Sequence, residues 1–225
     1  MGIDLIIVRH GRTAWNQEVR FRGRTDLPLD EVGLRQAQAA ARAVRSRWPA
    51  VAALYTSPLQ RARQTAGPIA EALGLAAQPR EELLDVDYGE WTGLSPAEAQ
   101  ERDPERYRLW RTAPQELQFP QGESLLQVQS RLQALLEHLL QEYAGRTVVL
   151  VGHLVVNRVL LCTLLGLDLG YFWRLGQDPA ALNQVHYENG NGRLLLLNDT
   201  CHLREAGLLG GTDGGEEKAL YPGRR

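Results

Sequence analysis

A short apolar run near the N-terminus, Leu5 to Val8, ends abruptly in Arg9, His10 and Gly11. An unbroken run of β-branched and leucine residues is typical of a strand buried on both faces, as in a parallel sheet. Open α/β sheets bind their ligands beyond the carboxyl ends of such strands. The sequence therefore places a fixed cation, a titratable ring and a residue without a side chain at a predicted ligand-binding edge.

The same arrangement recurs far downstream, where the apolar run Val148 to Val151 ends in Gly152 and His153. One histidine at a strand end is commonly a hydrogen-bonded structural residue, which is the plain interpretation of either histidine alone. Two histidines that each follow a buried strand and adjoin a glycine instead predict one shared chemical site.

Length and charge narrow the class of protein. The chain has 225 residues, enough for one α/β domain with its own core, and its 44% hydrophobic and 23% charged residues are typical of globular proteins. A net charge of −2 argues against a nucleic-acid partner bound by a broad basic surface. Any positive potential must therefore be local, at the arginines of the motifs.

Membrane-spanning and secretory segments are not expected. No stretch approaches the ~20 apolar residues of a membrane span, and the N-terminus lacks the basic flank and long apolar core of a signal peptide. Cys162 and Cys201 are the two cysteines of the sequence, which does not suggest a disulfide framework. We expect a cytoplasmic protein with no membrane partner.

Apolar periodicity and capping residues predict alternating helices and strands. The first half contains, in order, a helix capped by Asp30 that ends before Pro49, a strand over Val51–Thr56, and a helix that Ser57 and Pro58 open and Gly74 ends. The second half contains a helix from Ser124, the second histidine strand, a helix to Leu165 closed by Gly166, and a hairpin that turns at residues 189–192.

These elements predict an α/β fold, a three-layer α/β/α sandwich with a mostly parallel central sheet. Residues 89–122 combine tryptophans and prolines with poor periodicity, and we expect them to form a small helical insertion over the active site. One domain is expected over residues 1–203, followed by a flexible, glycine-rich tail over residues 204–225.

Phosphoryl transfer without a metal requires a neutral nitrogen nucleophile, fixed cations around the phosphoryl oxygens and an acid for the departing oxygen. His10 meets the first need if its other ring nitrogen donates to a backbone carbonyl, and Gly11 lets the backbone approach a phosphate. Arg9 and Arg61 supply permanent charge, and Arg61 falls in the first turn of a predicted helix, where backbone amides add to the attraction. His153 completes the set of groups around the phosphoryl oxygens. As a plain alternative, Arg61 belongs to an exposed, solvated helix face.

Other polar residues of the motifs have both a binding and a structural interpretation. Asn16 can donate to an oxyanion without adding charge, or it can be a turn residue. Arg22 and Gly23 are candidate substrate-binding residues, although Arg22, Arg24 and Asp26 also fit surface ion pairs.

Four motifs in order carry a resemblance to a known family. They are Arg-His-Gly-x-Thr-x-x-Asn at 9–16, Ser-Pro-Leu-x-Arg-Ala-x-Gln-Thr-Ala at 57–66, Gly-x-Trp-x-Gly at 89–93 behind an acidic residue, and Val-x-His at 151–153. Together with Pro-x-Gly-Glu-Ser at 120–124, they closely resemble the histidine phosphatase superfamily, in its phosphoglycerate mutase-like branch. The likeness extends from about Ile3 to Leu165 and implies a phosphoglycerate mutase-like fold.

The resemblance implies a two-step reaction through a phosphohistidine, with His10 as the nucleophile. The residues that would bind the phosphoryl group are Arg9, Arg61, His153 and, in an assisting role, Asn16.

The acid position of this family falls on Asp85, four residues before Gly89, where many relatives carry glutamate. Glu82 is the competing candidate, but the spacing favours Asp85. If the segment is extended, Asp87 shares a face with Asp85, and this pair of like charges would raise one pKa toward that of a useful acid.

Two further positions bear on the shape of the pocket. Leu154 stands where many relatives have glycine after the second histidine, and it should narrow the pocket or shift the loop. His202 follows the last predicted strand and could reach over the pocket to select substrates, although residues 198–202 are more typical of a turn.

The leading hypothesis is a metal-independent phosphatase that hydrolyses a small phosphomonoester and needs no cofactor. A phosphoglycerate mutase is the first alternative, but residues 94–121 are fewer and less basic than the corresponding segment of mutases tends to be. A catalytically silent module that binds phosphorylated ligands would lack the nucleophile or the acid. A metal hydrolase would have Arg9 and Arg61 beside the ion. The substrate is a small phosphorylated metabolite that the sequence does not identify, and the oligomeric state stays open, with a dimer as one option.

Overall fold

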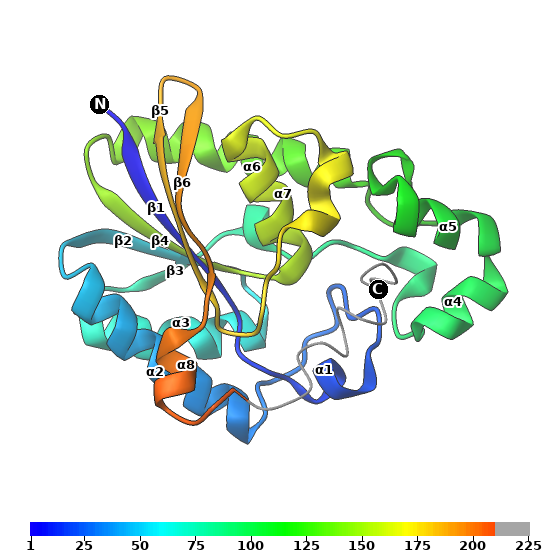
Figure 1. Cartoon of the computed structure of the whole chain (residues 1–225), viewed down its shortest axis with the longest axis horizontal. Helices are drawn as coiled ribbons and strands as arrows, with labels where there is room; N and C mark the ends of the chain where they lie inside the picture. Colours follow the sequence, from blue (N-terminus) through cyan, green and yellow to red (C-terminus); the bar gives the residue numbers. More distant parts are fainter. Residues whose placement is uncertain (210–225) are drawn as a thin grey trace.

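A six-stranded sheet lies at the centre of the computed structural model, which describes residues 1–209 (Figure 1). The strands are β1 (Ile3–Arg9), β2 (Val51–Thr56), β3 (Ala77–Pro79), β4 (Thr147–Gly152), β5 (Leu182–Glu188) and β6 (Asn191–Asp199). Their order is β3-β2-β4-β1-β5-β6, with parallel pairing from β3 to β1 and antiparallel pairing at β5 and β6. The prediction of a mostly parallel sheet is confirmed.

Helices cover both faces of this sheet and produce the predicted three layers (Figure 1). The α-helices are α1 (Ala14–Glu18), α2 (Glu31–Arg47), α3 (Gln60–Leu73), α4 (Pro96–Arg102), α5 (Pro104–Thr112), α6 (Leu125–Glu142), α7 (Leu154–Leu165) and α8 (Cys201–Glu205). Short 3-10 helices are η1 (Glu81–Leu83), η2 (Gly89–Trp91), η3 (Pro114–Glu116) and η4 (Leu169–Arg174). Helices α2, α3 and α8 bury one face of β1 through Ile6 and Val8, and α6 and α7 bury the other through Leu5 and Ile7.

Local sequence sets where most of the long helices begin and end. Asp30 Oδ1 accepts a hydrogen bond from the amide of Gly33 (2.7 Å) at the start of α2, and Ser124 Oγ accepts from the amide of Gln127 (3.2 Å) at the start of α6. Gly166 ends α7 in the left-handed conformation, with φ of 63°. These boundaries agree with the predicted ones.

Helix α3 begins differently from the prediction. Its first residue is Gln60, with Leu59 as the N-cap, so Ser57 and Pro58 precede the helix instead of opening it. Asp26 caps the helix from the preceding loop, because its Oδ1 accepts a hydrogen bond from the amide of Gln60 at 2.5 Å. The Asp26 carboxylate is therefore hydrogen-bonded to one of the helix N-terminal amides that were expected to attract an anionic ligand.

Two other regions depart from or extend the expectations. The expected insertion contains α4 and α5, which pack on each other at one end of the molecule (Figure 1). Residues 201–205 form α8 against α2, so the turn predicted at residues 198–202 is wrong, and helical structure continues past the predicted start of the tail at residue 204. Residues 210–225 of that predicted tail lie outside the described residues.

The parallel strands bring the two motif histidines to the same edge of the sheet. Strands β1 and β4 are neighbours with Arg9 opposite Gly152, so His10 and His153 follow directly after adjacent strand ends. The amide of His10 donates to the carbonyl of Gly152 (3.0 Å), which extends the pairing by one residue. The fold thus assembles the predicted site from segments that lie more than half the chain apart.

Candidate active site

His10 has one bonded and one unbonded ring nitrogen. Its Nδ1 lies 2.7 Å from the carbonyl oxygen of Gly11, and because a carbonyl oxygen can only accept, Nδ1 carries the proton. Its Nε2 is buried and has no hydrogen-bond partner among the described residues. Burial, followed by the charge of Arg61, lowers the pKa of His10 well below its usual value, so the ring is neutral and Nε2 has a lone pair.

The ring of His153 lies close to that of His10, with 5.2 Å between the ring centroids. Its Nδ1 accepts a hydrogen bond from Nε of Arg61 at 3.2 Å, because an arginine can only donate. Burial and then Arg61 lower the pKa of His153, so this ring is also neutral and carries its proton on Nε2. The two rings therefore offer complementary groups, a lone pair on His10 and an N–H donor on His153.

Arg61 joins the two sides of the site and is fully buried. Its Nη1 donates to the carbonyl of Thr25 (2.8 Å), and its Nη2 donates to the carbonyl of Gly23 (2.8 Å) and to Oδ2 of Asp85 (3.0 Å). These contacts exclude the alternative of an exposed helix face. The contact of Gly23 with the site is through its carbonyl, which helps to fix the guanidinium of Arg61.

Two more arginines are buried at this edge of the sheet. Arg9 is 2% exposed, and its Nη1 donates to the carbonyl of Gln177 at 2.5 Å. Arg22 is 5% exposed, and its Nη1 lies 3.5 Å from Oγ1 of Thr13. The charges of both arginines contribute to the lowered pKa values of the two histidines. The interpretation of Arg22 as half of a surface ion pair is therefore wrong, because its side chain lies inside the site.

Asp85 lies across Arg61 from the histidines, in a loop between η1 and η2. Its Oδ1 accepts from the amide of Val86 (3.0 Å), and its Oδ2 accepts from Arg61 and lies 3.8 Å from Nδ1 of His153. Burial raises the pKa of Asp85, and the nearby charges of Arg61 and Arg22 oppose that effect. A carboxyl group with a raised pKa next to two neutral histidines is suited to donate a proton.

The expected pair of like-charged carboxylates does not form. The segment is not a strand, the carboxylate of Asp87 accepts from the amide of Gly89 (2.8 Å), and burial is the largest cause of the raised pKa of Asp85. Within residues 1–209, the side chain of the competing candidate Glu82 forms no ion pair or hydrogen bond with the arginines or histidines of the site. Burial, and not a second carboxylate, distinguishes Asp85.

A narrow cleft adjoins Asp85. Its walls include the apolar side chains of Phe21, Leu154 and Val155, with Arg22 beside them. The space between these walls is about 20 Å³, room for about one water molecule. Leu154, which was expected to narrow the pocket, is part of this wall.

His202 lies elsewhere. Its ring is buried between α8 and α2, beside Arg47 and near the carboxylate of Asp199. The expectation that it reaches over the pocket is wrong, because α8 packs against α2 and His202 is not among the residues that line the cleft beside Asp85.

Two positions of the first motif have structural tasks in this fold. A Cβ on Gly11 would lie 2.6 Å from the carbonyl oxygen of Gly33, so the glycine allows the chain after β1 to pass close to the start of α2. The amide of Gly11 donates to Oγ1 of Thr65 (3.0 Å). Close packing against the start of α2 accounts for a glycine at this position. Oδ1 of Asn16 accepts from the amide and the hydroxyl of Thr13 (2.8 and 2.9 Å), as its structural interpretation requires.

Sequence reasoning missed the residues that hold the loop of Asp85. Glu123 accepts a hydrogen bond from the backbone of that loop, and Arg131 donates to two of its carbonyls. The available signals were Glu123 in the Pro-x-Gly-Glu-Ser segment and a charged residue seven positions after Ser124 on an otherwise leucine-rich helix.

Comparison with known proteins assigns the family. The sequence matches the histidine phosphatase superfamily (branch 1) over residues 5–200. It is 38% identical over 203 residues to phosphoserine phosphatase 1 of Hydrogenobacter thermophilus, covering 90% of this chain and 95% of that protein. It is also 33% identical over 207 residues to the probable phosphoglycerate mutase GpmB of Yersinia pestis, covering 89% of this chain and 95% of that protein.

Solved structures agree with this assignment. The fold is similar to that of a mycobacterial glucosyl-3-phosphoglycerate phosphatase in complex with VO3, with a TM-score of 0.80 and 30% identity over 88% of this chain and 99% of that one. Some mycobacterial relatives are longer, and at 38% identity this chain spans 54% of their length. The chain belongs to the histidine phosphatase superfamily, and its fold is phosphoglycerate mutase-like.

Among residues 1–209, no group of three or more histidine, cysteine, aspartate or glutamate side chains is arranged to hold a metal ion. No helix within the same range is long and apolar enough to cross a membrane.

Proposed function

We propose that this protein is a phosphatase that hydrolyses a small phosphomonoester through a phosphohistidine on His10. The observation that carries the proposal is the state of that ring, which is buried and neutral, with Nδ1 bonded to Gly11 and a lone pair on Nε2. Nearby are the buried cations Arg9 and Arg61 and the acid Asp85. Similarity to two phosphatases, one for phosphoserine and one for glucosyl-3-phosphoglycerate, supports the same conclusion.

In the first step, Nε2 of His10 attacks the phosphorus, the ester P–O bond breaks, and its electron pair goes to the leaving oxygen. Asp85 gives its proton to that oxygen, and the alcohol departs. Arg9, Arg61 and the Nε2–H of His153 bind the phosphoryl oxygens, where negative charge accumulates. Burial strengthens these interactions because little water screens them.

In the second step, water attacks the same phosphorus. The Asp85 carboxylate takes one proton from the water, the P–Nε2 bond breaks, and its electron pair returns to His10. Inorganic phosphate leaves, and the neutral histidine and the protonated acid are restored. The same carboxyl group thus acts first as an acid and then as a base.

The remaining candidates act on the substrate from the cleft. Arg22 contributes charge to the phosphoryl site, Leu154 bounds the leaving group, and Asn16 assists by holding the turn that follows His10. Gly23 acts indirectly, through Arg61.

A phosphoglycerate mutase is the second candidate, because the probable mutase of Yersinia pestis is 33% identical. Residues 94–121 form only α4, α5 and η3 and contain both acidic and basic residues, which gives little basis for retaining a bisphosphate intermediate. Conversion of 3-phosphoglycerate with and without 2,3-bisphosphoglycerate separates the two. We expect release of inorganic phosphate and no stimulation by the bisphosphate.

A panel of phosphorylated metabolites, assayed in excess chelator beside p-nitrophenyl phosphate, tests the function directly. We expect turnover of p-nitrophenyl phosphate that chelation does not reduce, and one or a few preferred metabolites. Activity that disappears with chelator and returns with a divalent ion would contradict the proposed chemistry.

Other expectations from the sequence stay proposals. We propose that residues 1–203 act as one domain and that the protein works in the cytoplasm on small metabolites. Size-exclusion chromatography with light scattering would determine whether it is a dimer.

A further inference from the structure

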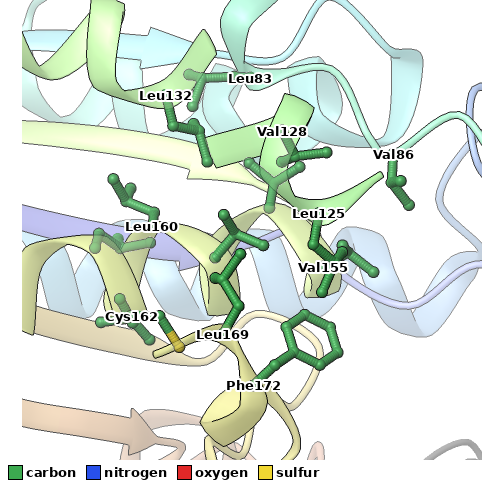
Figure 2. Close-up of a cluster of buried hydrophobic side chains, with 14 of the residues drawn as sticks. Leu83, Val86, Leu125, Val128, Leu132, Val155, Leu160, Cys162, Leu169 and Phe172 are labelled. Carbon is green, nitrogen blue, oxygen red and sulfur yellow. The ribbon is translucent and has the colours of Figure 1, made fainter. Parts of the chain in front are cut away.

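The loop that carries Asp85 forms neither a strand nor an α-helix. We define this acid loop as residues 82–87, which begin in the last two residues of η1 and end before η2. Two of its side chains, Leu83 and Val86, belong to the buried cluster with Val128 and Leu132 of α6 (Figure 2). Apolar packing anchors the loop but does not satisfy its backbone carbonyls, which must find hydrogen-bond donors elsewhere.

Glu123 supplies the centre of a polar anchor beside this loop. Its Oε2 accepts from the amide of Asp87 (3.0 Å), and its own amide donates to the carbonyl of Asp87 (2.8 Å). Its carboxylate also forms ion pairs with Nε of Arg131 (3.2 Å) and Nη2 of Arg24 (3.0 Å). Although burial opposes ionisation, these contacts lower the pKa of Glu123, so the carboxylate is charged at neutral pH.

The two arginines paired with Glu123 both donate to the backbone of the acid itself. Nη2 of Arg131 and Nε of Arg24 each lie 3.4 Å from the carbonyl oxygen of Asp85. Nη1 of Arg131 donates to the carbonyl of Glu82 at 2.5 Å. The carboxylate of Glu123 therefore aligns the guanidinium groups of Arg131 and Arg24. These two groups contact the backbone of the acid loop, including the carbonyl of Asp85 itself.

The motif that contains Glu123 also contacts the acid motif directly. A Cβ on Gly89 would lie 2.0 Å from the carbonyl oxygen of Pro120, and the amide of Glu90 donates to that same oxygen (2.9 Å). Gly89 has φ of 53°, a conformation that favours glycine. Residues 120–123 thus pack against the chain that follows Asp85 and fix its backbone conformation.

We propose that Glu123, through Arg131 and Arg24, is a positioning centre that fixes the backbone of Asp85 for proton transfer to the leaving group. This inference rests on the proposed function, since it concerns the acid of that reaction. Aspartate is a short side chain, so its carboxyl position follows its backbone closely. Proton transfer requires heavy atoms about 2.6–3.2 Å apart, and a displacement of about 1 Å is costly.

If Glu123 positions the acid, the loss of activity on mutating Glu123 should depend on the leaving group of the substrate. An alkyl phosphate needs a proton on its departing oxygen, whereas p-nitrophenolate departs with little help. The ratio of kcat/KM for the two substrates reports the first chemical step and is insensitive to the amount of active enzyme. A role limited to folding would lower both values equally.

The experiment compares Glu123→Gln with wild-type protein on p-nitrophenyl phosphate and on the best alkyl phosphate from the metabolite panel. We expect kcat/KM for the alkyl ester to fall by roughly tenfold, a fraction of a full acid contribution, and that for the aryl ester to change less than about twofold. The matched control is Glu90→Gln, which removes an exposed carboxylate paired with Arg102 and should leave both values unchanged.

Arg24→Gln gives a second probe if Glu123→Gln folds poorly, because Arg24 is 40% exposed and its loss is easier to tolerate. We expect a selective loss in the same direction of about threefold. Arg131→Lys should lose more than Arg24→Gln, because a lysine cannot contact Glu123 and two carbonyls in the same fork-like geometry. Thermal unfolding of each variant sets an assay temperature at which all are folded.

Equal losses for both esters, or no loss in either variant, would overturn the positioning role while leaving the phosphatase function intact. A wild-type enzyme that hydrolyses neither ester would instead contradict the proposed function itself. The two failures are therefore distinguishable from the same set of assays.

Discussion

The nucleophile side and the acid side of this site are built in different ways. His10 and His153 follow adjacent parallel strands, and ordinary strand pairing fixes their backbones. Asp85 lies in a loop whose backbone is held by side chains from remote segments, chiefly Glu123 and Arg131. The strand ends provide a rigid frame for attack and binding, whereas the acid depends on a charged cluster that could vary without altering the sheet.

This difference explains which residues local patterns identify. An apolar run followed directly by Arg9, His10 and Gly11 predicts, from neighbouring residues alone, that a strand ends at a chemical site. The local pattern at Asp85 is weaker, a spacing of four residues to Gly89, because its environment is formed by Arg61, Arg131 and Glu123, none of which is within 20 positions of it in the sequence.

The largest effect is expected on the nucleophile side. His10→Ala removes the atom that attacks phosphorus, so we expect kcat for p-nitrophenyl phosphate to fall by at least about 10⁴-fold, with the remaining fold intact. Steady-state assays measure the loss of kcat, and circular dichroism shows whether the variant is folded. Residual activity above about one per cent would assign the nucleophile to another residue.

The acid side should be affected less and more selectively. Asp85→Asn keeps the shape but cannot donate or accept the required proton, so we expect kcat/KM for an alkyl phosphate to fall at least about 100-fold, with a smaller loss for the p-nitrophenyl ester. Glu82→Gln is the matched control, three residues earlier, and should have no effect. A reversal of these two results would make Glu82 the acid.

A pH effect on stability tests the buried, neutral state of His10. In the unfolded chain histidine takes a proton near pH 6.5, but burial keeps the pKa of folded His10 well below that value. The unfolded state then binds more protons as the pH falls, so the free energy of unfolding decreases by about 1.4 kcal/mol between about pH 7.5 and 5.5. Urea unfolding of wild type and His10→Gln at both pH values should show this extra loss in the wild type alone. Parallel losses would indicate a solvated ring.

The smallest effect is expected at His202. Its place between α8 and α2 removes it from the site, so His202→Gln should leave kcat/KM for every good substrate within about twofold. A change of tenfold in the order of preferred substrates would restore it as a specificity residue.

The fold followed from the sequence wherever a local signal sufficed. The caps at Asp30 and Ser124 and the glycine after α7 set helix ends through contacts with their own neighbours. The start of α3 was mispredicted because Asp26, 34 positions away, caps Gln60. Helix α8 was missed because five residues give no periodicity, and packing on α2 stabilises it.

The same distinction applies to the site. Arg9, Arg61 and both histidines were predicted as site residues from the local motifs, and the structure brings them together. The burial of Arg22 was not predictable, because a charged residue in a polar loop has no pattern that separates the interior from the surface. If the segment were extended, a pair of like charges was expected to raise the pKa of one of Asp85 and Asp87. Burial instead raises the pKa of Asp85, and burial is a property of the folded chain.

Trapping the phosphorylated enzyme tests the central claim most directly. Wild-type and Asp85→Asn proteins are mixed with radiolabelled phosphomonoester, quenched in alkali and digested, and the labelled peptide is sequenced. We predict an acid-labile, alkali-stable phosphate on His10, more abundant in Asp85→Asn because its hydrolysis is slowed, and absent from His10→Ala. Label on any other residue, or turnover with no covalent phosphate at any quench time, would contradict a phosphohistidine at the end of the first strand.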